Sequence, residues 1–272
     1  MDDFNSLLDS MDELTAEEEA KAAETETKPI VQDALDAGSA NIDTYMDIVF
    51  CIDITGSMQP TINTVKNFAT SLYDDLIPFM LKQAHREVKA LRVKVLGFRD
   101  FYWDGKYALE ESDFFKLPEQ NQEFKDFVSS LEAKGGYDDP ESSLEALALA
   151  MKTDWVKVTD LSTQRSRHVI VLFTDDEAHK FEEAESYTGT NYPEGMPKSY
   201  KELLMAWNGQ GAYDMSMDKR AKRLIVFAPE ESYPWSDMAE DFENAVFLPM
   251  AKADGGVDVA REAIINTIGG TI

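Results

Sequence analysis

Short apolar runs alternate with helically spaced apolar positions along the chain from Tyr45 onward. Continuous apolar runs of this length are typical of strands buried on both faces of a parallel sheet. These runs predict strands at Met46–Asp53, Leu91–Phe98, His168–Thr174, Arg223–Ala228 and Ala245–Pro249. A sixth strand, antiparallel at the sheet edge, is expected at Tyr107–Leu117.

Apolar residues recur at helical spacing between these runs. The predicted helices are Gln59–Ala90, Gln122–Lys134, Pro140–Trp155, Lys198–Trp207, Ser236–Asn244 and Asp258–Ile268. Pro78 is expected to kink or divide the first of them. Strand and helix therefore alternate, which predicts an α/β fold with a doubly wound, mostly parallel six-stranded sheet flanked by helices, Rossmann-like in architecture. Ligands of such sheets bind at the carboxyl ends of the strands.

The first 42 residues have a different composition, rich in Glu, Asp, Ala and Thr, with Lys21 and Lys28 as the only basic side chains. Such a segment buries too little apolar surface to order itself, so we predict a mostly disordered acidic tail, 1–42, ahead of one domain, 43–272. Five apolar residues between Phe4 and Leu14 share one helical face, as in a docking helix or in a frayed helix lying on its own domain. Deletion of residues 1–40 is expected to shift the melting temperature by only a few degrees.

Charge and cysteine content narrow the function classes. The formal net charge of −26 opposes binding to nucleic acid and to anionic membranes. Cys51 is the only cysteine, and its apolar setting predicts a buried, unreactive thiol in a reducing compartment. Neither a secretory signal nor an apolar stretch of about 20 residues is evident. These features predict a cytoplasmic protein.

The first candidate site is Asp53-Ile54-Thr55-Gly56-Ser57, at the end of the first predicted strand. One carboxylate and two hydroxyls at alternate positions can point to one side of an extended turn. They are hard oxygen ligands of the kind that Mg²⁺ or Mn²⁺ prefers. The alternative is a capped helix start, with Thr55 or Ser57 as the N-cap ahead of Pro60.

Two further acidic loops follow the same architecture. Gly135-Gly136-Tyr137-Asp138-Asp139-Pro140-Glu141 precedes a predicted helix, and Thr174-Asp175-Asp176 follows a buried strand. Either loop alone could simply cap its helix. Three such loops at neighbouring strand ends converge in this fold, and no Cys or His cluster favours zinc. The sequence therefore predicts a Mg²⁺ or Mn²⁺ site.

These motifs resemble the metal-ion-dependent adhesion site of von Willebrand factor type A (VWA) domains, in the expected order over residues 45–270. The resemblance implies a non-enzymatic module that binds a protein partner through a divalent metal. Its metal residues would be Asp53, Thr55, Ser57, Asp138 and Asp175: the two hydroxyls bind directly, the aspartates matching Asp53 and Asp175 often act through water, and a partner's acidic side chain takes the sixth position.

The Gly-Gly-x-Asp-x-Pro-Glu loop and Gly97-Phe98-Arg99-Asp100 resemble a bacterial and alpha-kinase-associated branch of the family, which includes VWA proteins of tellurite-resistance-type systems. That resemblance implies a kinase or phosphatase among the partners. Many VWA domains have Thr where this chain has Asp138, so the site would carry one charge more and capture an acidic partner less well. Alternatively, Asp138 caps the helix at Pro140.

Basic side chains near these loops are few. Arg99 could compensate the acidic site or form a salt bridge with Asp100. His179 and Lys180 are the other basic candidates, and His179 is expected to be a surface residue. We assign His85 and His168 no role.

Two other functions are compatible with parts of the pattern. A haloacid-dehalogenase-like phosphotransferase also places Asp at a strand end, but its second acid would stand where this chain has Thr55. A VWA partner subunit of an AAA or MoxR-type ATPase is the other alternative, with ATP hydrolysis left to another chain because this one lacks a phosphate-binding Gly-x-x-x-x-Gly-Lys-Ser/Thr loop.

Overall fold

The computed structural model describes residues 42–82, 88–136, 140–185, 187, 189, 191–211, 213, 215–250, 265 and 268. All of its elements belong to the unit Asp43–Ile272. Several predictions lie outside the described residues: the acidic tail with its Phe4–Leu14 face, Asp138, and most of the helix at Asp258–Ile268, of which Ile265 and Ile268 are described and helical.

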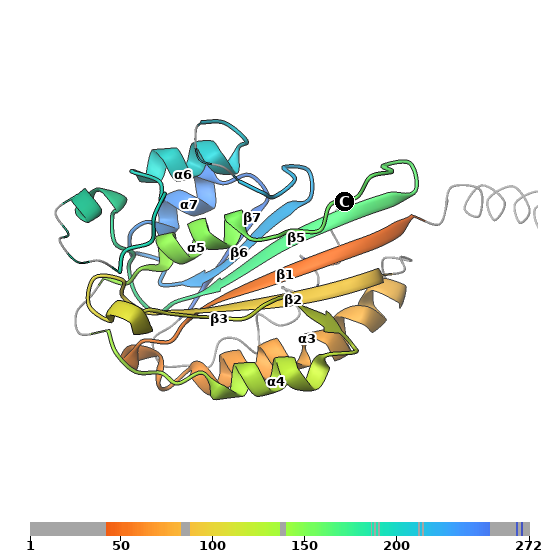
Figure 1. Ribbon diagram of the computed structural model, residues 1–272, viewed down its shortest axis with the longest axis horizontal. Helices are drawn as coiled ribbons and strands as arrows, with labels where there is room; N and C mark the ends of the chain where they lie inside the picture. The colour runs from red at the N-terminus through yellow and green to blue at the C-terminus, as the bar shows by residue number, and fades with distance from the viewer. Residues whose placement is uncertain are drawn as a thin grey trace, which may run out of the picture. The chain divides into compact units, whose positions relative to one another are not determined.

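The sheet is mostly parallel and contains seven strands in the order β3-β2-β1-β5-β6-β7, with β4 also paired to β2 (Figure 1). The neighbours of β1 are β2 and β5, and β5, β6 and β7 continue in parallel. The strands are β1 (Asp43–Asp53), β2 (Val88–Phe98), β3 (Leu109–Glu111), β4 (Phe115–Leu117), β5 (Gln164–Phe173), β6 (Lys222–Ala228) and β7 (Ala245–Pro249). The predicted fold class is confirmed.

The predicted number of six strands is wrong, because the expected strand Tyr107–Leu117 is two strands. Both are antiparallel to β2, as expected. Leu96 pairs with Glu111, but Val93 pairs with Phe115, so three residues oppose two between these pairs. An extra residue of this kind interrupts the ladder as a β-bulge does.

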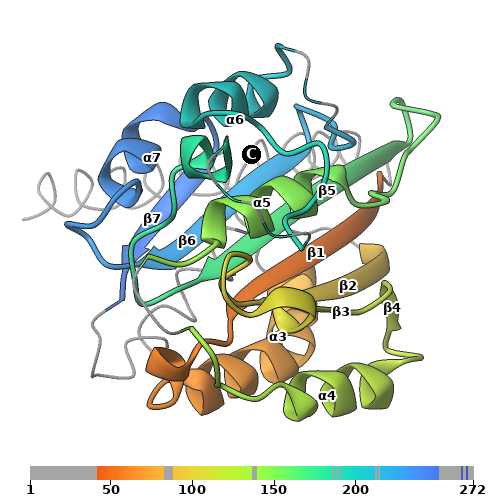
Figure 2. The same cartoon turned by 60° about the vertical axis from the view of Figure 1, so that its left-hand side comes forward.

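Helices cover both faces of the sheet (Figure 2). On one face lie α3 (Ile62–Lys82) and α4 (Asn121–Ser130); on the other lie α5 (Ser143–Lys152), α6 (Tyr200–Trp207) and α7 (Trp235–Asp241). The expected division at Pro78 is wrong, since α3 continues past it as one helix. The predicted helix also extended too far, because Val88–Ala90 belong to β2. Within the described residues, no helix is both long and apolar enough to span a membrane.

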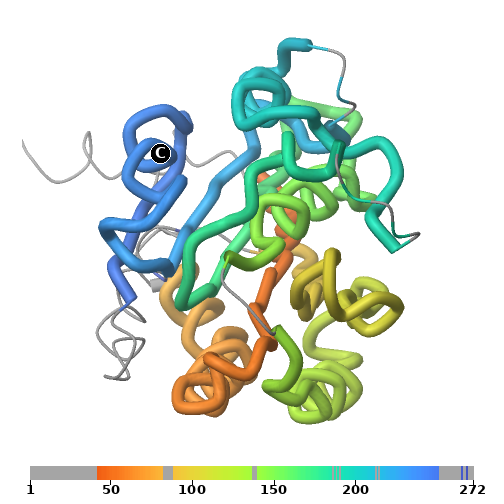
Figure 3. The backbone as a smooth tube through the Cα atoms, turned by 90° about the vertical axis from the view of Figure 1, so that its left-hand side faces the viewer, coloured from red at the N-terminus to blue at the C-terminus, as the bar shows by residue number. Residues whose placement is uncertain are grey.

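Alternate side chains of β1 enter two separate apolar cores. Ile48, Phe50 and Ile52 pack on the side of α3 and α4, whereas Val49 and Cys51 pack on the side of α5, α6 and α7. Burial on both faces explains why the strand is an uninterrupted apolar run. Burial also raises the pKa of the Cys51 thiol, consistent with the expected unreactive side chain. The apolar run Ile48–Ile52 of β1 is followed directly by polar residues at the carboxyl end of the strand, and Figure 3 views the sheet from the edge where β1 and β5 finish.

Candidate functional site

The loops after β1 and β5 meet at the carboxyl edge of the sheet. The two strands are paired in parallel, with Ile52 opposite Phe173, so the next residues, Asp53 and Thr174, come side by side. The Thr174 hydroxyl donates a 2.8 Å hydrogen bond to Asp53 Oδ2. Register thus joins two segments more than a hundred residues apart.

A chain of hydrogen bonds connects four of the five predicted metal residues. Asp53 Oδ1 accepts bonds from the Thr55 amide (2.9 Å) and hydroxyl (2.6 Å). The hydroxyl oxygens of Thr55 and Ser57 lie 3.1 Å apart, and Ser57 donates to Asp175 Oδ1 at 2.9 Å. Asp138, the fifth, lies outside the described residues. The described part of the predicted site is therefore one oxygen-rich cluster.

The cluster is buried at its base and open at Ser57. Asp53, Thr55 and Asp175 are 0%, 1% and 3% exposed, whereas Ser57 is exposed. Thr55 occupies the N-cap position of the short 3₁₀ helix Gly56–Met58 but makes no side-chain capping bond there. Its hydroxyl bonds Asp53 instead. The alternative of Thr55 as a side-chain N-cap is therefore not what the structure contains.

The Asp53 carboxyl is in an environment that disfavours its charge. Burial raises its pKa to about 7; hydrogen bonds from Thr55 and Thr174 act in the opposite direction, and the charge of Asp175 adds to the increase. The groups acting on it are thus hydroxyls, one amide and another carboxylate. A cation beside them would supply the missing opposite charge.

The segment Glu132–Gly136, which we call the glycine loop, packs against this cluster. Its backbone is tied to the first loop by bonds from Lys134 N to Ile54 O and from Gly56 N to Gly135 O, both 2.9 Å. Gly136 has φ +61°, and a Cβ there would lie 2.6 Å from Glu141 Oε1 and 2.9 Å from Thr55 Cβ. Only glycine can combine this backbone conformation with so close an approach.

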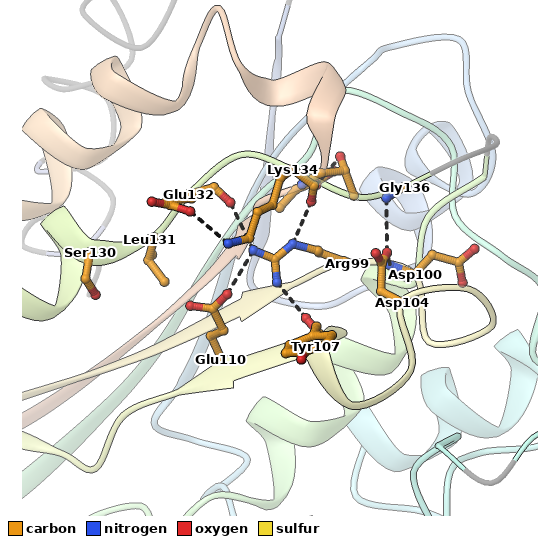
Figure 4. Close-up of polar contacts among 12 residues, drawn as sticks. Arg99, Asp100, Asp104, Tyr107, Glu110, Ser130, Leu131, Glu132, Lys134 and Gly136 are labelled. Atoms are coloured by element: carbon orange, nitrogen blue, oxygen red, sulfur yellow. Dashed lines mark hydrogen bonds and ion pairs between the residues drawn. The ribbon is translucent and has the colours of Figure 1, made fainter.

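Arg99 holds the glycine loop against β2 (Figure 4). Its guanidinium donates to the carbonyls of Lys134 (2.6 Å), Glu132 (2.9 Å) and Tyr107 (2.6 Å). Its ion pair is with Glu110, at 2.8 Å. The expected salt bridge to Asp100 is therefore wrong, and the guanidinium is committed to the loop backbone, so it does not compensate the acidic site. Local sequence could not reveal this, since the carbonyls become neighbours only in the fold.

Asp104 fixes the other side of the loop. Its Oδ2 accepts the Gly136 amide at 3.0 Å (Figure 4). Asp100, four residues earlier, accepts the Tyr102 amide at 2.7 Å and lies 3.4 Å from His179 Nε2. The Gly97-Phe98-Arg99-Asp100 segment therefore contributes scaffold contacts to the site.

Two buried acids lie close to the cluster: Glu141, which the sequence placed in the acidic loop without a role of its own, and Glu145, which sequence analysis missed. Glu141 is 3% exposed; burial, followed by the charges of Asp53 and Asp100, raises its pKa to about 10. Glu145 is fully buried, accepts a 2.8 Å bond from the Tyr192 hydroxyl, and has its pKa raised to about 7, chiefly by burial. Both acids hold a proton more readily than an exposed glutamate, which reduces the negative charge near the cluster. A glutamate on the apolar face of a helix was the available signal.

His179 is not the expected surface residue, since only 6% of it is exposed. Its Nδ1 lies 2.6 Å from Glu183 Oε2, and its ring is 4.4 Å from that of Tyr102. Burial lowers its pKa, but Asp100 and Glu183 together outweigh that effect and raise it. Lys180 is exposed, with its ammonium 5.5 Å from the Tyr233 ring.

The donors suit a hard divalent cation better than a soft one. In the part of the chain that is described, no three or more His, Cys, Asp or Glu side chains are grouped so as to hold a metal. The oxygen cluster contributes two carboxylates, Asp53 and Asp175, and two hydroxyls, Thr55 and Ser57. Neutral and anionic oxygens of this kind fit Mg²⁺ or Mn²⁺.

Comparisons with known proteins support the fold more strongly than a family. No family model matches the chain. It is 28% identical over 156 residues to the alpha-protein kinase vwkA of Dictyostelium discoideum, which corresponds to 57% of this chain and 22% of the kinase. The matching region is thus a small part of that relative's length.

The solved structures with a similar fold include the pilus adhesin SpaC from Lactobacillus rhamnosus GG, at a TM-score of 0.50 and 14% identity, covering 84% of this chain and 31% of the adhesin. They also include a von Willebrand factor type A protein from Catenulispora acidiphila, at a TM-score of 0.46 and 13% identity, covering 85% and 44%. At such identities the likeness to the adhesin concerns the fold alone. The chain has an α/β fold with a mostly parallel, seven-stranded sheet flanked by helices, a Rossmann-like architecture.

Proposed function

We propose that this chain is a non-enzymatic interaction module that binds a protein partner through a divalent cation, Mg²⁺ or Mn²⁺. The observation that carries the proposal is the oxygen chain from Asp53 through Thr55 and Ser57 to Asp175, which joins two strand-end loops. Asp138 is proposed as a fifth metal residue on the grounds of its sequence motif.

The differences in burial support different roles for these residues in the proposed site. Asp53 and Asp175 form the buried anionic base, which offsets the charge of a divalent cation. The hydroxyl oxygens of Thr55 and Ser57 offer neutral ligands above them, and the exposed Ser57 marks the side from which a partner can approach. A bound cation would act as a Lewis acid towards one partner oxygen.

A phosphotransferase mechanism is less well supported by the same geometry. An enzyme that used Asp53 as a nucleophile would need a second acid near position 55. Thr55 stands there, and its hydroxyl donates directly to Asp53 Oδ1. Such a hydroxyl cannot serve as a general acid near neutral pH, so binding remains the proposed activity.

We further propose a cytoplasmic, kinase-linked partner. The similarity to the alpha-protein kinase vwkA supports this choice over an ATPase or a phosphatase. A link to a stress or tellurite-resistance-type system rests on the motif resemblance alone, and the relative's organism gives no support to a bacterial setting.

Affinity capture with the full-length chain tests the proposed function. Partner retention should require Mg²⁺, disappear in EDTA, and return when Mg²⁺ is restored. Asp53→Ala should retain no more partner than an empty matrix, whereas Glu240→Ala, which removes an exposed carboxylate from α7, should behave as wild type. Partners retained equally in EDTA and by Asp53→Ala would overturn the proposal.

The role of Asp138 needs its own variant. Asp138→Thr removes one negative charge and restores the commoner hydroxyl. If Asp138 is a metal residue, Mg²⁺ should bind more weakly, and a glutamate-bearing peptide should bind as well or better. Unchanged affinity for both would assign Asp138 no role in the metal site.

A further inference from the structure

A cavity at the amino ends of β1, β5 and β6 gathers positive charge in a strongly acidic protein. Its volume is about 270 Å³. Among its lining residues are Thr44, Arg165, Arg167, Asp218, Arg220 and Arg223, and we name this cavity the arginine pocket. The chain has eight arginines and a net charge of −26, so half of its arginines lie around one pocket.

Strand register explains how the arginines meet. Arg165 and Arg167 are two apart on β5 and therefore share one face of the sheet. On β6, Arg223 pairs with Val169, which belongs to the same alternation, so its side chain lies on that face too. Arg220 joins from the loop before β6. Opposite them, Thr44 of β1 pairs with Arg165.

Two of these guanidinium groups are buried. Arg167 and Arg223 are 6% and 8% exposed. Arg223 Nη1 donates to the Lys222 carbonyl at 2.6 Å, but its Nε is buried without a hydrogen-bond partner. Burial accordingly lowers the pKa of Arg223. A buried donor of this kind carries a desolvation penalty that an anionic acceptor would offset.

The pocket's own carboxylate does not fill this role. Asp218 accepts from Arg220, with Nη2 3.2 Å from Oδ2, and this pair lies at the exposed rim. Four arginines and one carboxylate thus line the pocket, and that carboxylate is paired with the exposed Arg220. The buried Nε of Arg223 is left for an anionic acceptor.

We propose that the arginine pocket binds a doubly charged phosphate group, either a phosphorylated side chain or free phosphate. Guanidinium groups bind phosphate oxygens in pairs with defined geometry, and clustered arginines are a common means of holding a doubly charged phosphate. The cavity is at the lower limit of the roughly 300–1,000 Å³ of drug-sized ligand sites, so it suits a compact group. Nucleic acid is a poor alternative, because the remaining surface would repel a polyanion.

The arginine pocket is separate from the oxygen cluster of the proposed metal site. Thr44 and Asp53 lie near opposite ends of β1, about 30 Å apart at roughly 3.3 Å per residue. Phosphate binding should therefore persist in EDTA, which removes any contribution from a divalent cation. The phosphate could belong to a phosphorylated side chain of a protein or be free in solution, and the two sources can be distinguished by experiment.

Calorimetric titration of the full-length chain in EDTA tests the proposal. The probes are a phosphothreonine peptide with uncharged flanking residues, its unphosphorylated form, and inorganic phosphate. We expect the phosphopeptide to bind and the unphosphorylated peptide to remain below detection. Arg167→Met and Arg223→Met should each weaken binding by about tenfold or more, and the more exposed Arg165→Gln by about threefold. Lys201→Met, which removes one exposed positive charge on α6, should have no effect.

The titrations distinguish three outcomes: binding of a phosphorylated protein, binding of free phosphate, and failure of the proposal. Phosphopeptide binding much tighter than inorganic phosphate supports a phosphorylated protein as the source, and equal affinities support free phosphate. The melting temperature of each variant checks its fold, and Arg165→Gln keeps the test valid if a buried variant does not fold. The proposal is overturned if neither phosphate probe binds, or if Arg165→Gln and every folded buried variant bind as wild type does.

Discussion

The two ends of β1 and β5 differ sharply in chemistry, although the same strands form both. At the carboxyl end lie Asp53 and Asp175 with hydroxyl donors; at the amino end lie Arg165 and Arg167. Between them the strands are apolar on both faces and buried in two cores. The oxygen cluster at the carboxyl end contributes two carboxylates, whereas the pocket at the amino end is lined by four arginines and one aspartate.

Burial acts in opposite directions on the pKa values at the two ends. It raises the pKa of Asp53 to about 7 and that of Glu141 to about 10, and it lowers that of Arg223. In every case the charged form is disfavoured because the buried group lacks an opposite charge. The comparison therefore suggests ligands of opposite sign: a cation for the carboxyl end and an anion for the amino end.

Asp47 provides the contrast of a buried charge that has its partner. It is 1% exposed and accepts two bonds from Arg92, at 2.8 and 2.6 Å, and one from the Val156 amide at 2.6 Å. Asp47→Ala should lower the free energy of unfolding by about 3 kcal/mol, because it leaves the guanidinium and the amide unsatisfied. Urea denaturation of Asp218→Ala, which breaks a more exposed pair, should show a loss below about 1 kcal/mol. Equal losses would mean that burial does not govern the energetics of these charges.

Gly136 tests how tightly the carboxyl end is built. Gly136→Ala adds a Cβ at positive φ in contact with Glu141 and Thr55, and should cost about 2–3 kcal/mol of folding free energy. Gly209→Ala is the matched control: its φ is +68°, but a Cβ added there would be 3.5 Å from its nearest neighbour, Lys219 Cδ. The control should cost only about 1 kcal/mol, the backbone term alone. If chemical denaturation gives the same loss for both, the close approach at Gly136 is unimportant.

Glu145 tests the protonation of the buried acids. Its pKa of about 7 in the folded protein exceeds the ordinary 4.5, so its contribution to stability is fully present below about pH 4.5 and is lost as the pH rises through 7. Glu145→Gln keeps the shape and an acceptor for Tyr192 but cannot ionise. At pH 8 the free energy of unfolding of Glu145→Gln should exceed that of wild type by about 1–2 kcal/mol, and at pH 5 the two should differ little. Parallel pH profiles of melting temperature for the two proteins would contradict this environment.

Local pattern was sufficient for much of this molecule but not for its long-range contacts. Strands buried on both faces are continuous apolar runs, so Met46–Asp53 and its neighbours could be predicted, as could the loops that follow them. The split between β3 and β4 could not, because a bulge depends on cross-strand register.

The same limit applies to the sites. Asp53, Thr55 and Ser57 are neighbours in sequence, and an apolar strand preceding Asp175 indicated its place. By contrast, the contacts of Arg99 with Lys134 and Glu132, and the arginine pocket around Arg167 and Arg223, join segments through sheet pairing. Residue spacing along the chain does not predict contacts that depend on which strands pair.

The central claim is that the carboxyl end holds a divalent cation, and calorimetric titration of Mg²⁺ tests it most directly. Wild type and Glu240→Ala should bind one Mg²⁺ with the same affinity, and Asp53→Ala should bind at least about tenfold more weakly. Since a proton on Asp53, with its pKa of about 7, competes with the cation, wild-type affinity should fall about tenfold between pH 8 and pH 6. Equal Mg²⁺ binding by wild type and Asp53→Ala, or no Mg²⁺ or Mn²⁺ binding by wild type at pH 8, would contradict the account.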